Sequence, residues 1–222
     1  MSLDIILKYF TDFSPVQQQQ LQQLDAAYKD WNQKINVISR KDIDSLYEKH
    51  VLHSLAIAAA FDFPDGTEIV DLGTGGGFPG IPLAIYFPAV KFHLVDSIGK
   101  KLKVVEGVAT AIGLNNITVQ HARIEEVKNR KFDFVVSRAV APLKDLWNWS
   151  KPLLKKEAIT TRPGVSEPEA TTARVKPGLI CLKGGDLAKE IQESAVRPRI
   201  LEIHDIFPED FFREKYLLHV SR

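Results

Sequence analysis

Apolar residues follow a helical period over the first part of the chain, residues 1–62. The sequence at 14–17, Ser-Pro-Val-Gln, combines a capping residue, a proline suited to the first helical turn and a glutamine three positions after the cap, which predicts a helix start. Apolar residues then recur at roughly helical spacing: Val16, Leu21, Leu24, Tyr28, Trp31 and Ile35. In a second helical segment we expect four residues to point inward: Leu46, Val51, Leu55 and Ala58. Residues 1–62 are therefore predicted to form an N-terminal helical extension.

The period changes at Phe63, where short β-rich runs begin to alternate with helical ones. Strands are predicted at 68–72, 91–95, 117–120, 132–137, 179–183, 200–207 and 216–220, and helices at 80–87, 100–112, 142–151 and 186–195. This alternation predicts a mainly parallel, doubly wound α/β sheet that binds ligands at the carboxyl ends of its strands. The last two strands are expected to close the sheet as a pair. Residues 63–222 are thus predicted to form one ligand-binding domain.

One segment, residues 155–176, departs from this alternation because it contains almost no large apolar side chains. A stretch that buries little apolar surface does not offset the entropy lost on ordering. We therefore expect a mobile or disordered loop at 155–176.

The composition fits a globular protein with a substantial core, since 45% of the 222 residues are hydrophobic and 26% are charged. No run of 18 apolar residues occurs, and the first residues lack a basic stretch followed by an apolar one. Neither a membrane span nor a secretory signal is expected, and the interpretation is a cytoplasmic protein. The single cysteine, Cys181, lies in the apolar run 179–182 and is expected to be a buried structural thiol.

The net charge of +1 hides an uneven distribution. Residues 98–176 contain 15 Lys and Arg against 8 Asp and Glu, a balance of +7, while the rest of the chain contains 14 against 20, a balance of −6. Such a division is compatible with a face that binds a polyanion, and equally with an unevenly charged solvated surface.

The most informative stretch is the turn after the first predicted strand, residues 71–80, which reads Asp-Leu-Gly-Thr-Gly-Gly-Gly-Phe-Pro-Gly. Glycine is needed where the backbone takes positive φ or approaches a ligand closely. The stretch therefore predicts a ligand-binding strand, turn and helix, with Gly73 and Gly75 facing the ligand.

Two ligands compete for this turn. Residues 75–80 satisfy the pattern G-x-G-x-x-G, and an acid, Asp96, follows about 20 residues later, as in dinucleotide sites. The turn nevertheless begins earlier, at Gly73, and Asp71 stands beside it. A carboxylate there repels a pyrophosphate and suits a ligand with a cationic amino-acid tail, such as S-adenosylmethionine. The residues favour S-adenosylmethionine and leave the dinucleotide open.

Two further strand ends contribute candidate contacts. Asp96 can accept both hydroxyl protons of an adenosine ribose, which either cofactor carries; its alternative role is to cap the next helix, for which Ser97 is better placed. Residues 121–126, after the third strand, could frame the adenine. Arg138 directly follows the fourth strand, where substrate and cofactor should meet, although it could instead pair with a helix carboxylate.

Taken together, the motifs at 70–84, 94–101 and 136–139, with 31–39 and 50–54 upstream, resemble the RsmG family, also called GidB. The resemblance covers most of the chain. It implies a Rossmann-like class I methyltransferase fold and an enzyme that uses S-adenosylmethionine to methylate N7 of a guanine in 16S ribosomal RNA. By position, it assigns cofactor contacts to Gly73, Phe78, Ile124, Glu125 and Arg138. The chain departs from the family at 155–176, which is longer and more polar, and at 75–76, where Gly-Gly often is Gly-Pro.

The implied reaction needs no general base, because guanine N7 already presents a lone pair, so no catalytic residue is predicted. The implied partner is 16S ribosomal RNA or a small-subunit particle, and a monomer is favoured. Basic residues near the active strand ends are the candidate RNA contacts, each of which could equally be ordinary surface charge: Arg40, Lys41, His50, Lys100, Arg123 and Arg138. His50 and His53 are three residues apart, and no metal site is predicted from them. A dinucleotide-dependent oxidoreductase and a non-enzymatic RNA-binding module remain as alternatives.

Overall fold

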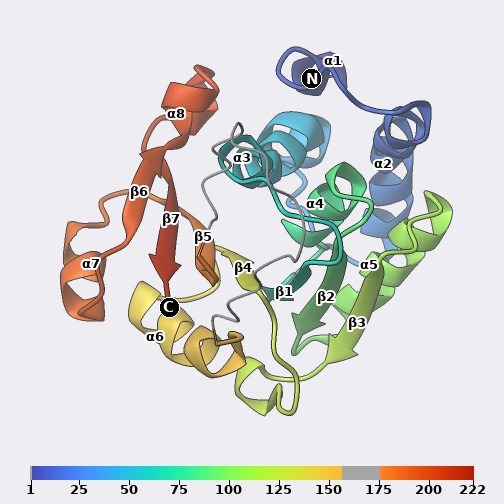
Figure 1. Ribbon diagram of the computed structural model, residues 1–222. Helices are drawn as coiled ribbons and strands as arrows, with labels where there is room; N and C mark the ends of the chain where they lie inside the picture. Colours follow the sequence, from blue (N-terminus) through green and yellow to red (C-terminus); the bar gives the residue numbers. More distant parts are fainter. Residues whose placement is uncertain (1, 157–175) are drawn as a thin grey trace, which may run out of the picture.

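The computed structural model describes residues 2–156 and 176–222, and within them seven strands form one sheet in the order β3-β2-β1-β4-β5-β7-β6 (Figure 1). The strands are β1 (Glu68–Leu72), β2 (Lys91–Asp96), β3 (Ile117–His121), β4 (Phe134–Arg138), β5 (Gly178–Gly184), β6 (Arg199–Glu202) and β7 (Lys215–Ser221). Strands β1 to β5 pair in parallel, whereas β7 runs antiparallel to both β5 and β6. This confirms the predicted mainly parallel sheet and its closing terminal pair.

Helices cover both faces of the sheet, as a doubly wound fold requires. They are α1 (Asp4–Leu7), α2 (Pro15–Lys34), α3 (His53–Ala60), α4 (Gly80–Tyr86), α5 (Gly99–Ala111), α6 (Leu143–Ser150), α7 (Ala188–Ser194) and α8 (Ile203–Ile206). One hydrophobic cluster joins residues of α1 to α5 to Ile69 of β1, and a second joins α6 to Val70 of the same strand. Neighbouring residues of a strand point to opposite faces, so β1, β2, β4, β5 and β7 each contribute residues to both clusters.

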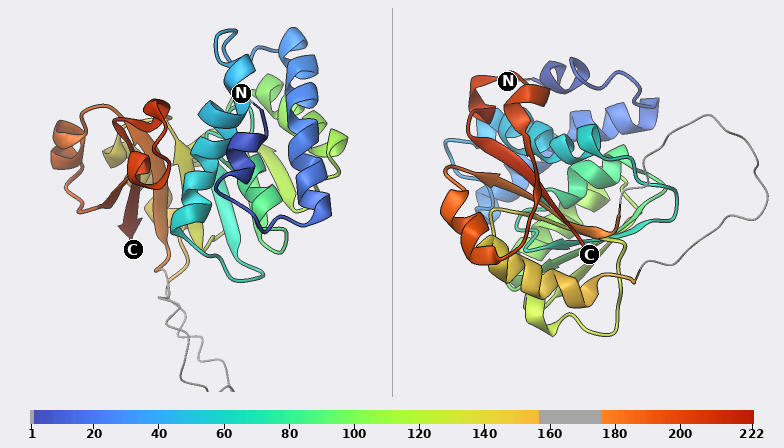
Figure 2. Two further views of the ribbon diagram at one scale, coloured as in Figure 1. Left: turned by 90° about the horizontal axis from the view of Figure 1, so that it is seen from above. Right: turned by 60° about the vertical axis from the view of Figure 1, so that its left-hand side comes forward.

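The N-terminal helix α2 starts as predicted, with the reciprocal capping box between Ser14 and Gln17. Val16 is 64% exposed and lies in the first turn, ahead of the buried Leu21, Leu24 and Tyr28. Figure 2 shows α2 beside α5. There Trp31 packs on Gly107, where a Cβ atom would lie 2.1 Å from the indole. Residues 1–62 and 63–222 share the first cluster, and the boundary between them stays a prediction.

The second predicted helix is interrupted. A short 3-10 turn, η1 (Ile43–Ser45), precedes a six-residue π-helix, η2 (Tyr47–Leu52), which continues into α3. π-helices are rare and are often found at functional sites. The apolar period alone does not distinguish this winding from an ordinary α-helix.

Two C-terminal boundaries differ from the prediction. The strand expected over 200–207 ends at Glu202, and α8 takes over at Ile203. Ile203 and Phe207 are buried in the cluster that contains residues of α1 to α5, so packing overrides the β-rich composition of that run. The strand expected over 132–137 begins at Phe134, since Phe132 forms only an isolated bridge with Leu154.

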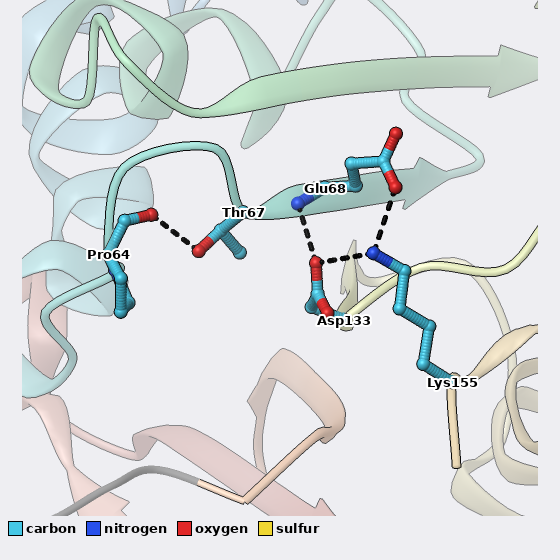
Figure 3. A network of polar contacts seen from close by, with 5 residues as sticks. All are labelled: Pro64, Thr67, Glu68, Asp133 and Lys155. Carbon is cyan, nitrogen blue, oxygen red and sulfur yellow. Dashed lines mark hydrogen bonds and ion pairs between the residues drawn. The ribbon is translucent and has the colours of Figure 1, made fainter. Parts of the chain in front are cut away.

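The loop predicted at 155–176 lies mostly outside the described residues, and only Lys155, Lys156 and Lys176 fall within them. The loop stays a prediction, and Lys155 at its start has charged partners. Its Nζ forms ion pairs with Glu68 Oε2 at 2.9 Å and with Asp133 Oδ2 at 3.0 Å (Figure 3). The same Asp133 oxygen accepts the Glu68 N–H at 2.8 Å, so this end of the segment is tied to the start of β1.

Two smaller predictions are also tested. Cys181 is fully buried in β5, and burial raises the pKa of its thiol to about 12, as expected for a structural cysteine. Within residues 2–156 and 176–222, no helix has the length and apolar character needed to cross a membrane.

Candidate active site

A cavity of about 620 Å³ opens at the carboxyl ends of β1, β2 and β4, the edge of the sheet at which the fold predicts a ligand. Its lining contains all seven residues predicted to contact the cofactor: Gly73, Gly75, Phe78, Asp96, Ile124, Glu125 and Arg138. The other lining residues are Val37, Thr74, Gly76, Ser97, Ile98, Lys101, Arg123, Ala139 and Val140. The fold thus gathers lining residues from five segments of the chain, and the contact of the seven predicted residues with a cofactor stays a prediction.

The glycine turn, residues 73–80, carries the chain from β1 into α4. Gly73 and Gly75 have φ angles of 69° and 59°, a region that L side chains rarely adopt. The N–H groups of Gly73 and Thr74 both donate to the Val95 carbonyl, at 2.9 and 3.0 Å. These bonds fix the turn to the end of β2, with Gly73 and Gly75 on the wall of the cavity.

Asp71 lies behind the glycine turn rather than in the cavity. Its carboxylate is fully buried, and Oδ2 accepts hydrogen bonds from Thr74 Oγ1 at 2.6 Å and from the Gly80 N–H at 2.9 Å. Burial raises the pKa of Asp71 to about 7, against the opposing effect of these bonds and of the Arg138 cation. The prediction that Asp71 faces a cationic ligand tail is therefore wrong: the side chain braces the turn from inside.

Asp96 ends β2 and lines the cavity. Its Oδ2 accepts the Gly75 N–H at 2.9 Å, and its Oδ1 accepts the Ile98 N–H at 2.8 Å, just ahead of α5. The side chain of Ser97 does not cap α5, so the expectation that Ser97 rather than Asp96 caps this helix is wrong. A carboxylate offers about four acceptor sites, so Asp96 can still accept ribose hydroxyls, which remains a prediction.

Arg138 ends β4 inside an aromatic cluster. Its guanidinium carbon lies 5.0 Å from the Phe78 ring centroid, and Phe78 stacks in turn on Tyr28 with centroids 5.0 Å apart. Nη2 donates to Nδ1 of His50 at 3.0 Å, and Nη1 donates to the Lys49 carbonyl at 3.4 Å. The alternative, in which Arg138 pairs with a carboxylate on a helix, is not observed among the described residues. Burial lowers the pKa of Arg138 to about 10, which leaves a cation at neutral pH.

His50 supports Arg138 from the π-helix η2. Because a guanidinium is a donor only, the Nδ1 that receives its hydrogen bond carries no proton. Burial and then the Arg138 cation lower the pKa of His50 to about 4, so its ring is neutral at physiological pH. Nε2 is buried with no hydrogen-bond partner among the described residues. This half-buried position does not support the prediction that His50 contacts RNA.

The other candidate RNA contacts are separated. Arg123 is exposed and lines the cavity. Arg40, Lys41 and Lys100 are also exposed but do not belong to the described lining. Their contact with RNA stays a prediction.

Val37, Lys101 and Val140 are among the lining residues that the sequence analysis did not place at the site, and Tyr28 supports the glycine turn from behind the lining. The buried Tyr28 hydroxyl donates to the Gly76 carbonyl at 2.7 Å. Val37 packs on the same glycine, since a Cβ on Gly76 would lie 3.1 Å from the Val37 side chain. Asn32 shapes this segment, because its Oδ1 accepts the N–H groups of Val37 and Ile38 at 2.8 and 3.0 Å. The available signal was the position of Asn32 and Val37 within the resemblance at 31–39.

Tyr28→Phe is expected to weaken binding of S-adenosylmethionine, the predicted cofactor, severalfold, because it leaves the Gly76 carbonyl unpaired. Leaving a buried acceptor unsatisfied costs about 1–3 kcal/mol. The matched control is Tyr47→Phe, which removes a 2.8 Å bond to the Leu21 carbonyl away from the cavity. Both variants should lose stability in denaturant titrations, and only Tyr28→Phe should lose affinity in calorimetry. Equal affinities in the two variants would show that Tyr28 does not support the cofactor site.

Stability is expected to fall as pH is lowered from 7.5 to 5.5. Burial lowers the pKa of four of the six histidines: His50, His53, His93 and His219. Their contribution is complete above the unfolded pKa near 6.5 and is lost as pH falls toward the lower folded values. Asp71 and Glu48, whose pKa values are raised, act in the opposite direction and offset part of this loss. We expect the free energy of unfolding from urea titrations to decrease over this range, and an unchanged or rising value would contradict it.

Comparison with known proteins adds independent findings. The model of the family described as "rRNA small subunit methyltransferase G" (GidB) matches residues 17–162. A protein named Ribosomal RNA small subunit methyltransferase G from Phocaeicola vulgatus is 52% identical over 219 residues, covering 99% of this chain and 98% of the relative. The protein of the same name from Flavobacterium johnsoniae is 46% identical over 218 residues, covering 98% and 97%.

Solved structures support the fold. The crystal structure of a SAM-dependent methyltransferase from Aquifex aeolicus aligns with a TM-score of 0.55 at 13% identity, covering 82% of this chain and 98% of that one. The ribosomal protein L11 methylase from Lactobacillus delbrueckii aligns with a TM-score of 0.52 at 19% identity, covering 77% and 76%. At these identities the likeness concerns the fold alone, and it confirms the predicted class I methyltransferase architecture.

Proposed function

The chain belongs to the rRNA small subunit methyltransferase G (GidB) family, and on this basis we propose that it transfers a methyl group from S-adenosylmethionine to N7 of a guanine in 16S ribosomal RNA. The observation that carries the proposal is the cavity at the strand ends, whose lining includes every residue that the family resemblance assigns to the cofactor. The two alternatives, an oxidoreductase and a non-enzymatic RNA-binding module, have no support from this family.

The chemistry of the cavity fits S-adenosylmethionine. Its volume of about 620 Å³ lies within the range of roughly 300–1,000 Å³ typical of small-molecule sites. Asp96 retains acceptor capacity for ribose hydroxyls, Ile124 offers an apolar side chain to the adenine, and the glycine turn permits close approach of the backbone. Arg138 provides a fixed cation for an anionic group of the ligand. When bound, S-adenosylmethionine supplies an electrophilic methyl group on a sulfonium.

The reaction requires alignment rather than proton transfer. Guanine N7 presents its lone pair in the plane of the base, so the residues of the chain need to orient the reactants and exclude water. Proper orientation can contribute up to about 7–11 kcal/mol to lowering the barrier. Arg138 is held by contacts within the chain, with Phe78, His50 and the Lys49 carbonyl, and a side chain fixed in this way limits the ordering that ligand binding costs.

The RNA partner is either free 16S ribosomal RNA or a small-subunit particle. Lys101 and Arg123 lie on the cavity wall, and Lys100 is exposed beside Lys101 at the start of α5. Each phosphate contact made by such residues strengthens RNA binding and makes the affinity fall more steeply as the salt concentration rises. We propose that the enzyme acts as a monomer in the cytoplasm, where ribosomal RNA is found.

The proposed function is tested by incubating the full chain with labelled S-adenosylmethionine and small-subunit RNA that lacks the modification, either free or in subunits. Nucleoside analysis should reveal N7-methylguanosine. Absence of label from both substrates would refute the enzyme assignment. Calorimetry separates the cofactors: binding of NAD without binding of S-adenosylmethionine would favour the oxidoreductase alternative.

A further inference from the structure

The turn after β4, residues 139–142, forms one wall of the cofactor cavity in a strained conformation. Ala139 has a φ of 51°, in the left-handed region, and its N–H donates to the Leu182 carbonyl at 3.3 Å. Val140 follows, 38% exposed, and lines the cavity. It lies against the glycine turn, because a Cβ on Gly73 would be 2.7 Å from Val140 Cγ2. Such a backbone persists only where surrounding contacts hold it.

An ion pair between Lys183 and Glu190 holds the far end of this turn. Lys183 lies near the carboxyl end of β5 with 9% of its side chain exposed, and its Nζ is 2.6 Å from Glu190 Oε1. The same Nζ donates to the Ala141 carbonyl, and the same Oε1 accepts the Leu143 N–H at 2.7 Å. The two charges therefore bind the backbone on both sides of Pro142.

Glu190 also supplies what the local sequence of α6 lacks. The first N–H groups of a helix have no partner within it, and a nearby negative charge stabilises that end. Pro142, which precedes α6, has no side-chain acceptor, and no side chain caps this helix start from within the segment. Glu190 reaches it from α7 instead.

A buried ion pair by itself contributes little net stability, so its geometry is more informative than its presence. We propose that Lys183 and Glu190 are a positioning pair, which fixes the turn 139–142 and thereby holds Val140 and Arg138 against the cofactor cavity. Arg138 is adjacent to the turn, and its register partner on β5 is Leu182, next to Lys183. The inference rests on the proposed function, since it assumes that this cavity takes S-adenosylmethionine.

The test compares three variants. Glu190→Ala removes the acceptor of the Leu143 N–H. The double exchange Lys183→Glu with Glu190→Lys keeps a pair of opposite charges, but the glutamate at 183 cannot donate to the Ala141 carbonyl and the lysine at 190 cannot accept the Leu143 N–H. The control is Glu193→Ala, which breaks the exposed pair with Lys189 on the same helix, at 3.8 Å. Misplacement of a positioning element can lower the rate on the order of 10- to 100-fold. We expect that loss of kcat, with weaker S-adenosylmethionine binding in calorimetry, for Glu190→Ala and for the exchange, and near wild-type values for Glu193→Ala.

Amide hydrogen exchange gives a readout that needs no cofactor. The Leu143 amide should exchange faster in Glu190→Ala and in the double exchange, and at the wild-type rate in Glu193→Ala. Recovery of affinity, kcat and protection by the double exchange would overturn the inference, because it would show that only the charge pair matters. Wild-type affinity, kcat and amide exchange in Glu190→Ala would also overturn the inference. If the wild type binds S-adenosylmethionine but methylates no RNA, the proposed function fails while calorimetry and exchange still decide the inference. If it binds no S-adenosylmethionine, the cofactor part of the inference fails as well, and exchange still decides whether the pair fixes the turn.

Discussion

Arg138→Met is expected to weaken S-adenosylmethionine binding by about 10- to 100-fold. The substitution removes the guanidinium from the Phe78 ring and from its hydrogen bonds to His50 and the Lys49 carbonyl, while retaining an apolar stem of similar length. Hydrogen bonds of charged groups are worth about 1.5–3 kcal/mol, and each 1.4 kcal/mol corresponds to about a tenfold change in affinity. Calorimetry with the full chain measures the loss.

The matched control for this variant is Arg130→Met. Arg130 repeats the same arrangement away from the cofactor cavity: its guanidinium carbon lies 5.1 Å from the Phe132 ring centroid, and its Nη1 donates to His93 Nδ1 at 3.0 Å. Loss of this second arrangement should leave cofactor affinity within about twofold of wild type, a difference of roughly 0.4 kcal/mol. Equal losses in both variants would attribute the Arg138 effect to general destabilisation.

Arg138→Lys separates charge from geometry. Lysine keeps the positive charge but lacks the planar fork that stacks on an aromatic ring while donating to two partners. If charge alone held the ligand, this variant would bind like the wild type. We expect it to remain close to Arg138→Met, because the stacking on Phe78 and the bond to His50 define where the charge sits.

The central part of the site was predictable because its residues follow a local rule. A parallel sheet places the carboxyl ends of its strands at one edge, so Gly73 after β1, Asp96 at the end of β2 and Arg138 at the end of β4 were expected at the same edge once the strands were identified. The strand order and the antiparallel position of β7 between β5 and β6 depend on contacts between distant segments. A periodic pattern does not carry that information.

The supporting contacts were not predictable for the same reason. Tyr28 has the helical spacing of a core residue, and nothing local indicates that its hydroxyl meets Gly76 in the glycine turn. Asp71 shows the opposite error: its neighbours favour a ligand contact, yet the carboxylate turns inward to Thr74 and Gly80. Residue type and spacing identify which chemistry is present, whereas burial decides which group faces the ligand.

Gly73→Val is expected to abolish measurable S-adenosylmethionine binding, a loss of more than about 100-fold, or roughly 3 kcal/mol. At a φ of 69°, the new Cβ would lie 2.7 Å from Val140 Cγ2, and the branched side chain would fill space at the junction of the two turns that line the cavity. Either the valine or the wall formed by Val140 must move, and either movement changes the shape of the cavity where the glycine turn meets it.

Backbone strain must be separated from this occlusion, and Gly113→Val provides the control. Gly113 follows α5 with a φ of 67° and is exposed, and no neighbouring atom lies within 4 Å of the position that a Cβ would take. A left-handed L residue costs about 1–2 kcal/mol at either position, which is small beside a typical stability of roughly 5–15 kcal/mol. Both variants should therefore fold, with lowered midpoints in denaturant, and only Gly73→Val should fail to bind in calorimetry. Wild-type affinity in folded Gly73→Val would remove the glycine turn from the cofactor site, because the strain is shared and only the obstruction differs.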